Sequence, residues 1–171
     1  MNGNQYINQM KNVKLSAKID YAIKNHKPIV ALESTVFTHG LPYPRNFKTA
    51  LQLERIIKKI HVAPATIGLI NGFIHIGLNE SEIETLAKSE HLRKISKRDL
   101  GIAIGKGLSG GTTVAGTITV ANLVGIKVFS TGGIGGVHRN EPFDISADLY
   151  TLANTPLIVV CAGAKAILDL P

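Results

Sequence analysis

The sequence predicts an α/β protein, with a three-layer α/β/α arrangement around a mixed, mostly parallel sheet. Short apolar runs rich in β-branched residues alternate with amphipathic segments through most of the 171 residues, as in a sheet covered by helices. The dipeptide Asn71-Gly72 between two such runs favours a hairpin, and therefore an antiparallel pair. A hydrophobic content of 44% suits one domain with a packed core, and no apolar run reaches membrane-spanning length.

The net charge of +7 does not by itself indicate a nucleic-acid-binding protein. Much of the excess lies in residues 1–27, which we interpret as a solvated arm and helix face. Aromatic residues make up only 5% of the chain, and there is no Trp, so little is available to stack on bases. We expect no nucleic-acid and no membrane partner. A second basic group is interpreted as a phosphate pocket in a loop: Arg93, Lys94, Lys97 and Arg98.

The amino-terminal half is expected to alternate helices and strands. Residues 1–14 are polar and are interpreted as a loose arm, and Ser16 can cap a short helix through His26, so that residues 1–27 form an arm and first helix. A second domain segment then runs from 28 to 171. Its first elements are expected to be strands at 28–32, 65–71 and 73–77, a helix at about 45–61, and a helix opened by an Asn79–Glu82 capping box.

The carboxyl-terminal half is rich in glycine, with 11 of the 17 glycines between Gly101 and Gly136. Glycine just after a strand lets backbone N–H groups approach an anion, so this stretch is a candidate phosphate cradle, although it contains neither a P-loop nor a dinucleotide fingerprint. We expect Leu157–Cys161 to be a central strand buried on both faces, followed by a helix from Ala164. The other expected elements are a helical stretch at 117–123, a strand at 126–130 and a helix capped by Ser146.

Residues with catalytic potential follow three of the expected strands. Glu33 follows the first strand, the glycine-rich loop at 132–139 follows a later one, and Lys165 follows the last. Because parallel strands present their carboxyl ends at one edge of a sheet, these groups are expected to converge. An amine in the first turn of a helix with apolar surroundings is pushed toward its neutral, nucleophilic form, which suits Schiff-base chemistry. The alternative for Lys165 is a solvated surface lysine.

Two aspartates add a possible metal site. Asp144 and Asp148 offer the carboxylate oxygens that magnesium and manganese prefer, although Asp is also favoured at helix N-termini for electrostatic reasons. His39 and His138 are, singly, interpreted as loop histidines. A lysine nucleophile, a glutamic acid, a metal carboxylate and a phosphate cradle together describe a sugar-phosphate lyase or a glycosidase.

Several blocks of this sequence closely resemble the pseudouridine-5′-phosphate glycosidases, whose bacterial members include the indigoidine synthase A-like proteins. The resemblance runs from about residue 28 to the end, in family order, and the family's chains continue well past Pro171, so we expect a copy truncated at its C-terminus. The matching blocks are Val30-Ala-Leu-Glu-Ser-Thr, His39-Gly-Leu-Pro-Tyr-Pro, Lys94-Ile-Ser-Lys-Arg-Asp-Leu, Gly111-Thr-Thr-Val-Ala, Thr131-Gly-Gly-Ile-Gly-Gly-Val-His-Arg, Phe143-Asp-Ile-Ser-Ala-Asp-Leu and Val159-Val-Cys-Ala-Gly-Ala-Lys-Ala-Ile-Leu-Asp.

The resemblance implies an enzyme of nucleoside catabolism that reversibly cleaves pseudouridine 5′-phosphate to uracil and ribose 5-phosphate. It implies a homotrimer with one divalent ion, preferably Mn²⁺, per subunit. By this resemblance Lys165 forms an imine with C1′ of the ring-opened ribose, Glu33 is the proton donor and Asp144 binds the metal. The implied substrate-binding residues are Lys94, Val114, Ser146, Ala147 and Asp148, with Thr113, Thr131, Gly132 and His138 in support.

Two alternatives to this glycosidase remain open at the level of sequence. One is another Lys-dependent sugar-phosphate lyase, and the other is a catalytically silent fragment that acts only as a subunit or binding module. A C–C glycoside has no leaving oxygen to protonate, which disfavours the two-carboxylate mechanism of ordinary glycosidases and favours an imine. We expect a cytoplasmic protein, although the basic character of residues 1–27 leaves import into an organelle open.

Overall fold

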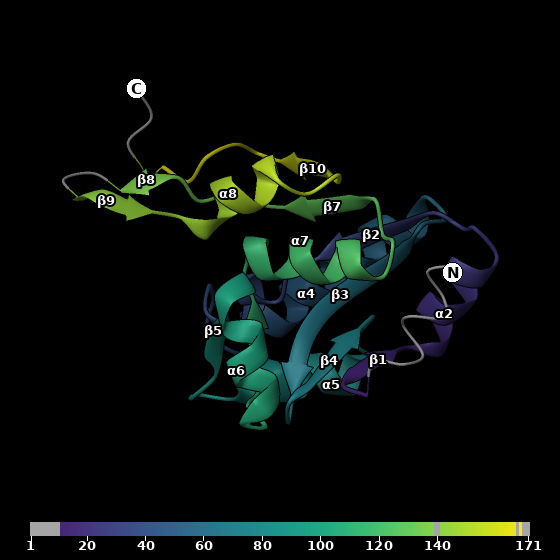
Figure 1. Ribbon diagram of the computed structural model, residues 1–171. Helices are drawn as coiled ribbons and strands as arrows, with labels where there is room; N and C mark the ends of the chain where they lie inside the picture. Colours follow the sequence, from purple (N-terminus) through teal and green to yellow (C-terminus); the bar gives the residue numbers. More distant parts are fainter. Residues whose placement is uncertain (1–10, 139–140, 167, 169–171) are drawn as a thin grey trace.

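The computed structural model describes residues 11–138, 141–166 and 168, and its centre is a mixed sheet of eight strands (Figure 1). Six strands follow the order β1–β4–β3–β2–β7–β10, while β6 pairs with β3 and β5 pairs with β6. The strands are β1 (Val13–Leu15), β2 (Ile29–Leu32), β3 (Ala63–Ile70), β4 (Phe73–Ile76), β5 (Arg93–Ile95), β6 (Gly110–Thr112), β7 (Val128–Thr131) and β10 (Ile158–Cys161).

Most neighbouring strands in this sheet are parallel. β2 pairs in parallel with both β3 and β7, and β7 pairs in parallel with β10. β3 is antiparallel to β4, through the expected hairpin turn at Asn71-Gly72, and to β6. The first half of β3 contacts β2 and its second half contacts β4 and β6, so this long strand joins the two parts of the sheet. The expected mixed, mostly parallel α/β sheet is confirmed.

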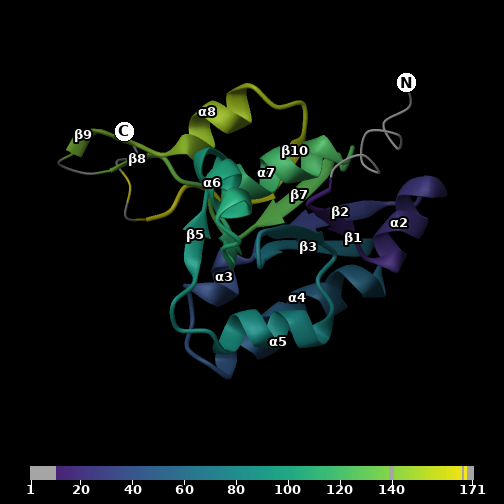
Figure 2. The same ribbon diagram turned by 60° about the horizontal axis from the view of Figure 1, so that its bottom comes forward.

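Helices cover both faces of the sheet (Figure 2). α4 and α5 lie together on one face, α7 lies on the other, and α8 packs on α7, which gives the expected three layers. A small ribbon of β8 (Val137–His138) and β9 (Glu141–Ile145) extends beside α8. The helices are α2 (Ala17–Lys24), α3 (Thr35–Thr38), α4 (Arg45–Lys59), α5 (Glu80–Lys88), α6 (Leu100–Gly105), α7 (Val114–Leu123) and α8 (Ala147–Ala153), with a 3₁₀ turn η1 (Lys97–Asp99).

Local sequence signals explain where several helices begin. The Ser16 hydroxyl accepts a hydrogen bond from the Ile19 backbone N–H, and Asn79 with Glu82 forms the expected capping box. The largest core cluster lies between the sheet and α7 and includes Ile67, Ile118 and Phe129, while a second cluster around Phe37 and Ile83 lies under α4 and α5. No helix in the described part of the chain is both long and apolar enough to cross a membrane.

Residues before 28 contribute to the fold more than a loose arm would. Val13–Leu15 form β1, which extends the sheet next to β4, and Ile19 is fully buried in the main core cluster. Residues 1–10, which make up most of the expected arm, lie outside the described residues. Arg93–Ile95, expected to be part of a loop, form the short strand β5 instead, because they pair with the glycine-rich β6.

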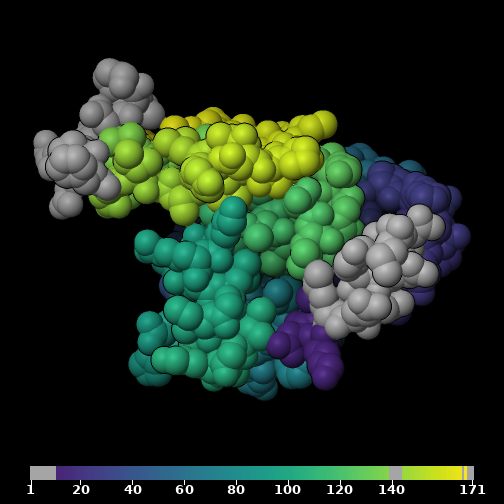
Figure 3. All heavy atoms as spheres, in the orientation of Figure 1, coloured from purple at the N-terminus to yellow at the C-terminus, as the bar shows by residue number. Residues whose placement is uncertain are grey.

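The last strand, β10, differs from the expected buried central strand. It is the edge strand of the main sheet and pairs with β7 alone among the described strands. Ile158 and Val160 are 64% and 57% exposed, whereas Val159 packs against the main core. Figure 3 shows these late residues on the outer surface of the molecule. Cys161 is a free, half-buried thiol.

Candidate functional site

The end of β2 is held in place by a buried group of hydroxyls. The Ser34 side chain is fully buried; it donates a hydrogen bond to the Ile67 carbonyl at 2.6 Å and accepts one from the Thr112 backbone N–H at 2.8 Å. Thr112 in turn donates to the same carbonyl at 2.8 Å. These bonds tie the chain after β2 to both β3 and β6. The neighbouring Glu33 is therefore presented from a rigid strand end.

The Glu33 carboxylate is oriented by two threonines that lie at the ends of different strands. The Thr35 hydroxyl donates to Glu33 Oε2, and the Thr131 hydroxyl donates to Oε1. Thr35 follows β2 and Thr131 ends β7, the adjacent parallel strand, so convergence of the strand ends brings the three side chains together. Both carboxylate oxygens are thus fixed, and the plane of the carboxylate is set before any ligand binds.

Lys165 is carried by a loop that pairs with the glycine-rich segment. The Ile134 N–H donates to the Gly163 carbonyl, and the Lys165 N–H donates to the Ile134 carbonyl, both at 3.1 Å. Gly163 has a φ of +126°, which only glycine adopts without strain. A Cβ on Gly133 would lie 3.3 Å from Lys165 Cγ, so the glycine allows the two segments to pack closely.

This pairing replaces the helix expected from Ala164. The Lys165 N–H is bonded to the Ile134 carbonyl, Ala164 forms a bridge with Ile134, and the described residues 164–166 are not helical. The Lys165 side chain is exposed. The expectation that a helix N-terminus and an apolar surround act on its amine was therefore wrong as a description of the local structure.

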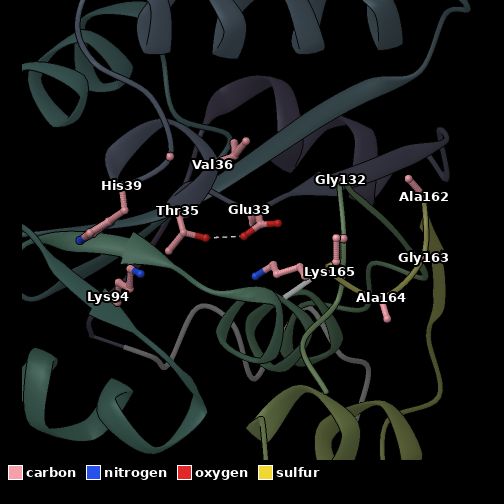
Figure 4. A pocket seen from close by; sticks show the side chains of 13 residues that line it. Glu33, Thr35, Val36, His39, Lys94, Gly132, Ala162, Gly163, Ala164 and Lys165 are labelled. Atoms are coloured by element: carbon pink, nitrogen blue, oxygen red, sulfur yellow. Dashed lines mark hydrogen bonds between the residues drawn. The ribbon is translucent and has the colours of Figure 1, made fainter. Parts of the chain in front are cut away.

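Glu33 and Lys165 line the same pocket, which has a volume of about 460 Å³. Figure 4 shows the Lys165 side chain pointing toward Glu33, with Thr35 beside the carboxylate and with Lys94 and His39 at the opposite end from Ala162. This volume lies within the range of small-molecule sites. The lining residues are Glu33, Thr35, Val36, His39, Gly40, Lys94, Gly132, Gly133, Ala162, Gly163, Ala164, Lys165 and Ala166.

Of the residues expected at the site, the pocket therefore brings together Glu33, Lys94, Gly132 and Lys165, with Thr131 attached through its bond to Glu33. Lys94 is exposed on β5, where its ammonium can meet a phosphate. The other three members of the expected basic group, Arg93, Lys97 and Arg98, are not among the lining residues; the Lys97 ammonium lies 5.5 Å from the centre of the Tyr150 ring.

Five further expected residues lie around the N-termini of α7 and α8 instead. Asp148 is 6% exposed, and its two carboxylate oxygens accept hydrogen bonds from the Ala115 N–H at 2.9 Å and the Gly135 N–H at 2.8 Å. Its carboxylate thus occupies the position at the N-terminus of α7 where an anion would otherwise bind. The others are Thr113, which caps α7, Val114, whose side chain is buried, Ser146, which caps α8, and the exposed Ala147.

Asp144 and His138 lie on the β8–β9 ribbon and are not among the residues that line the pocket. Asp144 Oδ2 lies 2.9 Å from His138 Nδ1, and the Asp144 side chain is 59% exposed. Within residues 11–138, 141–166 and 168, no three His, Cys, Asp or Glu side chains converge as a metal cluster. A single exposed carboxylate is nevertheless a donor of the type that Mn²⁺ and Mg²⁺ accept alongside water. The donor chemistry fits a hard divalent ion held mainly by solvent.

Two lining residues with polar side chains, Thr35 and His39, were not among the expected site residues. Thr35 stands two positions after Glu33, and this spacing is the signal that could have revealed a hydroxyl able to reach back to the carboxylate. His39 was interpreted as a loop histidine, but it lines the pocket, and both of its ring nitrogens are within hydrogen-bond distance of partners.

Comparisons with known proteins show the family to which the chain is similar. The family model described as "Indigoidine synthase A like protein" matches residues 18–171. A pseudouridine-5′-phosphate glycosidase of Caldanaerobacter subterraneus is 56% identical over 93% of this chain, and one of Escherichia coli is 53% identical over 92%. The crystal structure of the prealnumycin C-glycosynthase AlnA in complex with ribulose 5-phosphate is 42% identical, with a TM-score of 0.84 over 93% of this chain and 52% of that one.

An indigoidine synthase A-like protein of Thermotoga maritima gives a TM-score of 0.82 at 33% identity, covering 92% of this chain. In each comparison this chain spans about half the length of its relative, 52% of each of the two glycosidases.

Proposed function

The chain belongs to the family of indigoidine synthase A like proteins, and we propose that it carries the catalytic lysine and acid of a pseudouridine-5′-phosphate glycosidase. The reaction is the reversible conversion of pseudouridine 5′-phosphate and water to uracil and ribose 5-phosphate. The observation that supports this proposal most is the meeting of Lys165 and Glu33 in one pocket, from strand ends far apart in the sequence. Relatives at more than 50% identity bear the name of this activity.

In the proposed mechanism the neutral Lys165 amine attacks C1′ of the sugar, and the ring oxygen leaves C1′ and takes up the proton that the attacking nitrogen loses, so that it becomes the 4′-hydroxyl. Glu33 donates a proton to the uracil carbon that holds the sugar, and the C–C bond then breaks as the nitrogen lone pair forms an iminium at C1′. Water hydrolyses the iminium, which releases ribose 5-phosphate and restores the amine, and the proton set free in this step returns to Glu33. Because a C–C glycoside has no leaving oxygen to protonate, its cleavage needs another way to stabilise the positive charge at C1′, and the iminium provides it.

The hydroxyls of Thr35 and Thr131 support this role because they fix both oxygens of Glu33. A fixed carboxyl group transfers its proton along one direction, which is what a single target carbon requires. Lys94, at the far end of the pocket from Ala162, is proposed to bind the 5′-phosphate as a point charge.

A divalent ion, Mn²⁺ by preference and one per subunit, is proposed to be held by Asp144, with His138 beside it and water completing its shell. When bound, it would supply positive charge for an anionic substrate. The proposed substrate contacts of Val114, Ser146 and Ala147 would come from the N-termini of α7 and α8, although the Ser146 N–H itself donates to the Gly136 carbonyl. We also propose that the protein is a homotrimer and that it is cytoplasmic. Light scattering after size exclusion would test the oligomeric state.

The proposal is tested by measuring uracil release from pseudouridine 5′-phosphate with Mn²⁺ present. Lys165→Ala should abolish release, and Glu33→Gln should lower it about 10²–10⁴-fold, the usual contribution of a positioned acid. Lys127→Ala, which changes a lysine outside this pocket, is the control. Release by Lys165→Ala at the wild-type rate would refute the proposal.

A further inference from the structure

His39 stands between the two segments that carry Glu33 and Lys94. It ends α3, the short helix that follows Glu33, and its ring Nε2 lies 3.1 Å from the carbonyl oxygen of Leu92, two residues before Lys94. The other ring nitrogen, Nδ1, lies 2.8 Å from the Thr38 hydroxyl. The imidazole thus joins positions 53 residues apart in the sequence, and it does so at the end of the pocket that Lys94 occupies (Figure 4).

The direction of the bond to Leu92 is fixed by chemistry. A carbonyl oxygen can only accept, so Nε2 carries a proton. Nδ1 then either accepts from the Thr38 hydroxyl or, in the imidazolium, donates to it. The Thr38 hydroxyl also lies 3.1 Å from the Ser34 carbonyl and has one hydrogen to give. When that hydrogen goes to the Ser34 carbonyl, Nδ1 must be protonated and donate to the Thr38 oxygen; a neutral ring instead accepts the Thr38 hydrogen in place of that carbonyl.

Leu92, which His39 contacts, directly precedes β5, and β5 is restrained by its pairing with β6 and by the buried Ile95. β5 is three residues long and pairs with β6 alone among the described strands. The bond from the Arg93 N–H to the Ser109 carbonyl is long, at 3.4 Å. Leu92 itself packs against the cluster around Phe37, which belongs to α3. The position of Lys94 relative to Glu33 therefore depends on β6 and, at the start of β5, on α3, through the apolar contact of Leu92 and through the imidazole.

We propose that His39 is a positioning residue for phosphate binding: by bridging Thr38 and Leu92 it sets the place of the Lys94 ammonium relative to Glu33 and Lys165. The inference rests on the proposed function, since it supposes a sugar phosphate with its phosphate at Lys94. It assigns His39 no proton transfer and no contact with the substrate. Its effect is therefore on KM, through Lys94, and not on the chemical step.

The test is steady-state uracil release from pseudouridine 5′-phosphate by the wild type, His39→Ala, Lys94→Ala and the double variant. Loss of one hydrogen bond predicts a rise in KM of about threefold to tenfold for His39→Ala, with little change in kcat. In the Lys94→Ala background the same substitution should change KM no further, because the residue it positions is absent. His39→Gln, whose amide can donate to Leu92 and accept from Thr38, should restore much of the affinity.

His91→Ala is the matched control, because His91 is exposed and adjacent to Leu92 but does not line the pocket. It should leave KM unchanged. An unchanged KM in His39→Ala, or an equal effect of that substitution with and without Lys94, would overturn the inference. Should His39→Ala unfold at the assay temperature, His39→Asn carries the same prediction, since Asn is well tolerated at a helix end but is too short to span both partners.

Failure of this inference is distinguishable from failure of the proposed function. Borohydride reduction of the wild type in the presence of ribose 5-phosphate traps the imine at Lys165 as a stable adduct, and this test does not involve His39. If that adduct forms and His39→Ala binds normally, only the role of His39 is wrong. If no adduct forms in the wild type, the proposed function itself fails, and with it the inference that rests on it.

Discussion

Replacing Asp148 by Asn separates two roles that the sequence and the structure assign to this residue. By family resemblance Asp148 contacts the substrate, whereas its buried carboxylate accepts backbone hydrogen bonds from Ala115 and Gly135. An Asn side chain keeps one acceptor oxygen, but its amide group would face a second N–H donor. The variant thus loses one hydrogen bond to a charged group and some of the favourable charge at the start of α7.

The expected cost of this loss is about 2 kcal/mol, the middle of the range for a hydrogen bond to a charged group. For a chain of this size that corresponds to a fall in melting temperature of about 4–8 °C. Differential scanning fluorimetry measures it, and Asp144→Asn, whose carboxylate is exposed, is the control that should not melt earlier. An unchanged melting temperature for Asp148→Asn together with a large rise in KM would refute the structural role and favour direct substrate contact.

Three other substitutions test separate parts of the account. Gly110→Ala would place a Cβ 2.2 Å from the backbone oxygen of Arg93, so it should lower the free energy of unfolding, measured in urea, by about 1–3 kcal/mol. Gly101→Ala, in open space within α6, should raise that free energy slightly. Equal effects of the two substitutions would contradict the packing argument. Burial lowers the pKa of Lys18 below its ordinary 10.5, so the unfolded chain binds the proton more tightly than the folded one. The free energy of unfolding should therefore increase with pH up to about 10.5 by more in the wild type than in Lys18→Met. Parallel curves of unfolding free energy against pH, from urea unfolding, would count against this. Asp144→Asn should lose stimulation of uracil release by Mn²⁺, and stimulation at the wild-type level would show that the ion binds elsewhere.

The structural features that were predicted correctly from the sequence follow from local physical causes or from a general rule of parallel sheets. Asn71 and Gly72 both take positive φ, at 50° and 77°, as the tight hairpin requires. Asn79 and Glu82 satisfy each other's backbone N–H groups wherever the helix packs. The convergence of Glu33 and Lys165 follows from the rule that parallel strands end at one edge, and it needs no knowledge of which strands are neighbours.

The features that the sequence interpretation missed depend on contacts between distant residues. The apolar run at Ile158–Cys161 reads alike for a central strand and for an edge strand with one packed face, and only the sheet order decides between them. The helix expected from Ala164 is absent at the described residues 164–166, which pair instead with Ile134, about 30 residues earlier. The bridge from His39 to Leu92 likewise has no local signature.

The proposed chemistry depends on one covalent event, the capture of an open sugar by Lys165. It is measured by incubating the protein with ribose 5-phosphate, reducing with borohydride and mapping the modified peptide by mass spectrometry. We predict a reduced ribose 5-phosphate adduct on Lys165 and its disappearance in Lys165→Arg. An adduct carried by a different lysine, or none at all, would contradict the account.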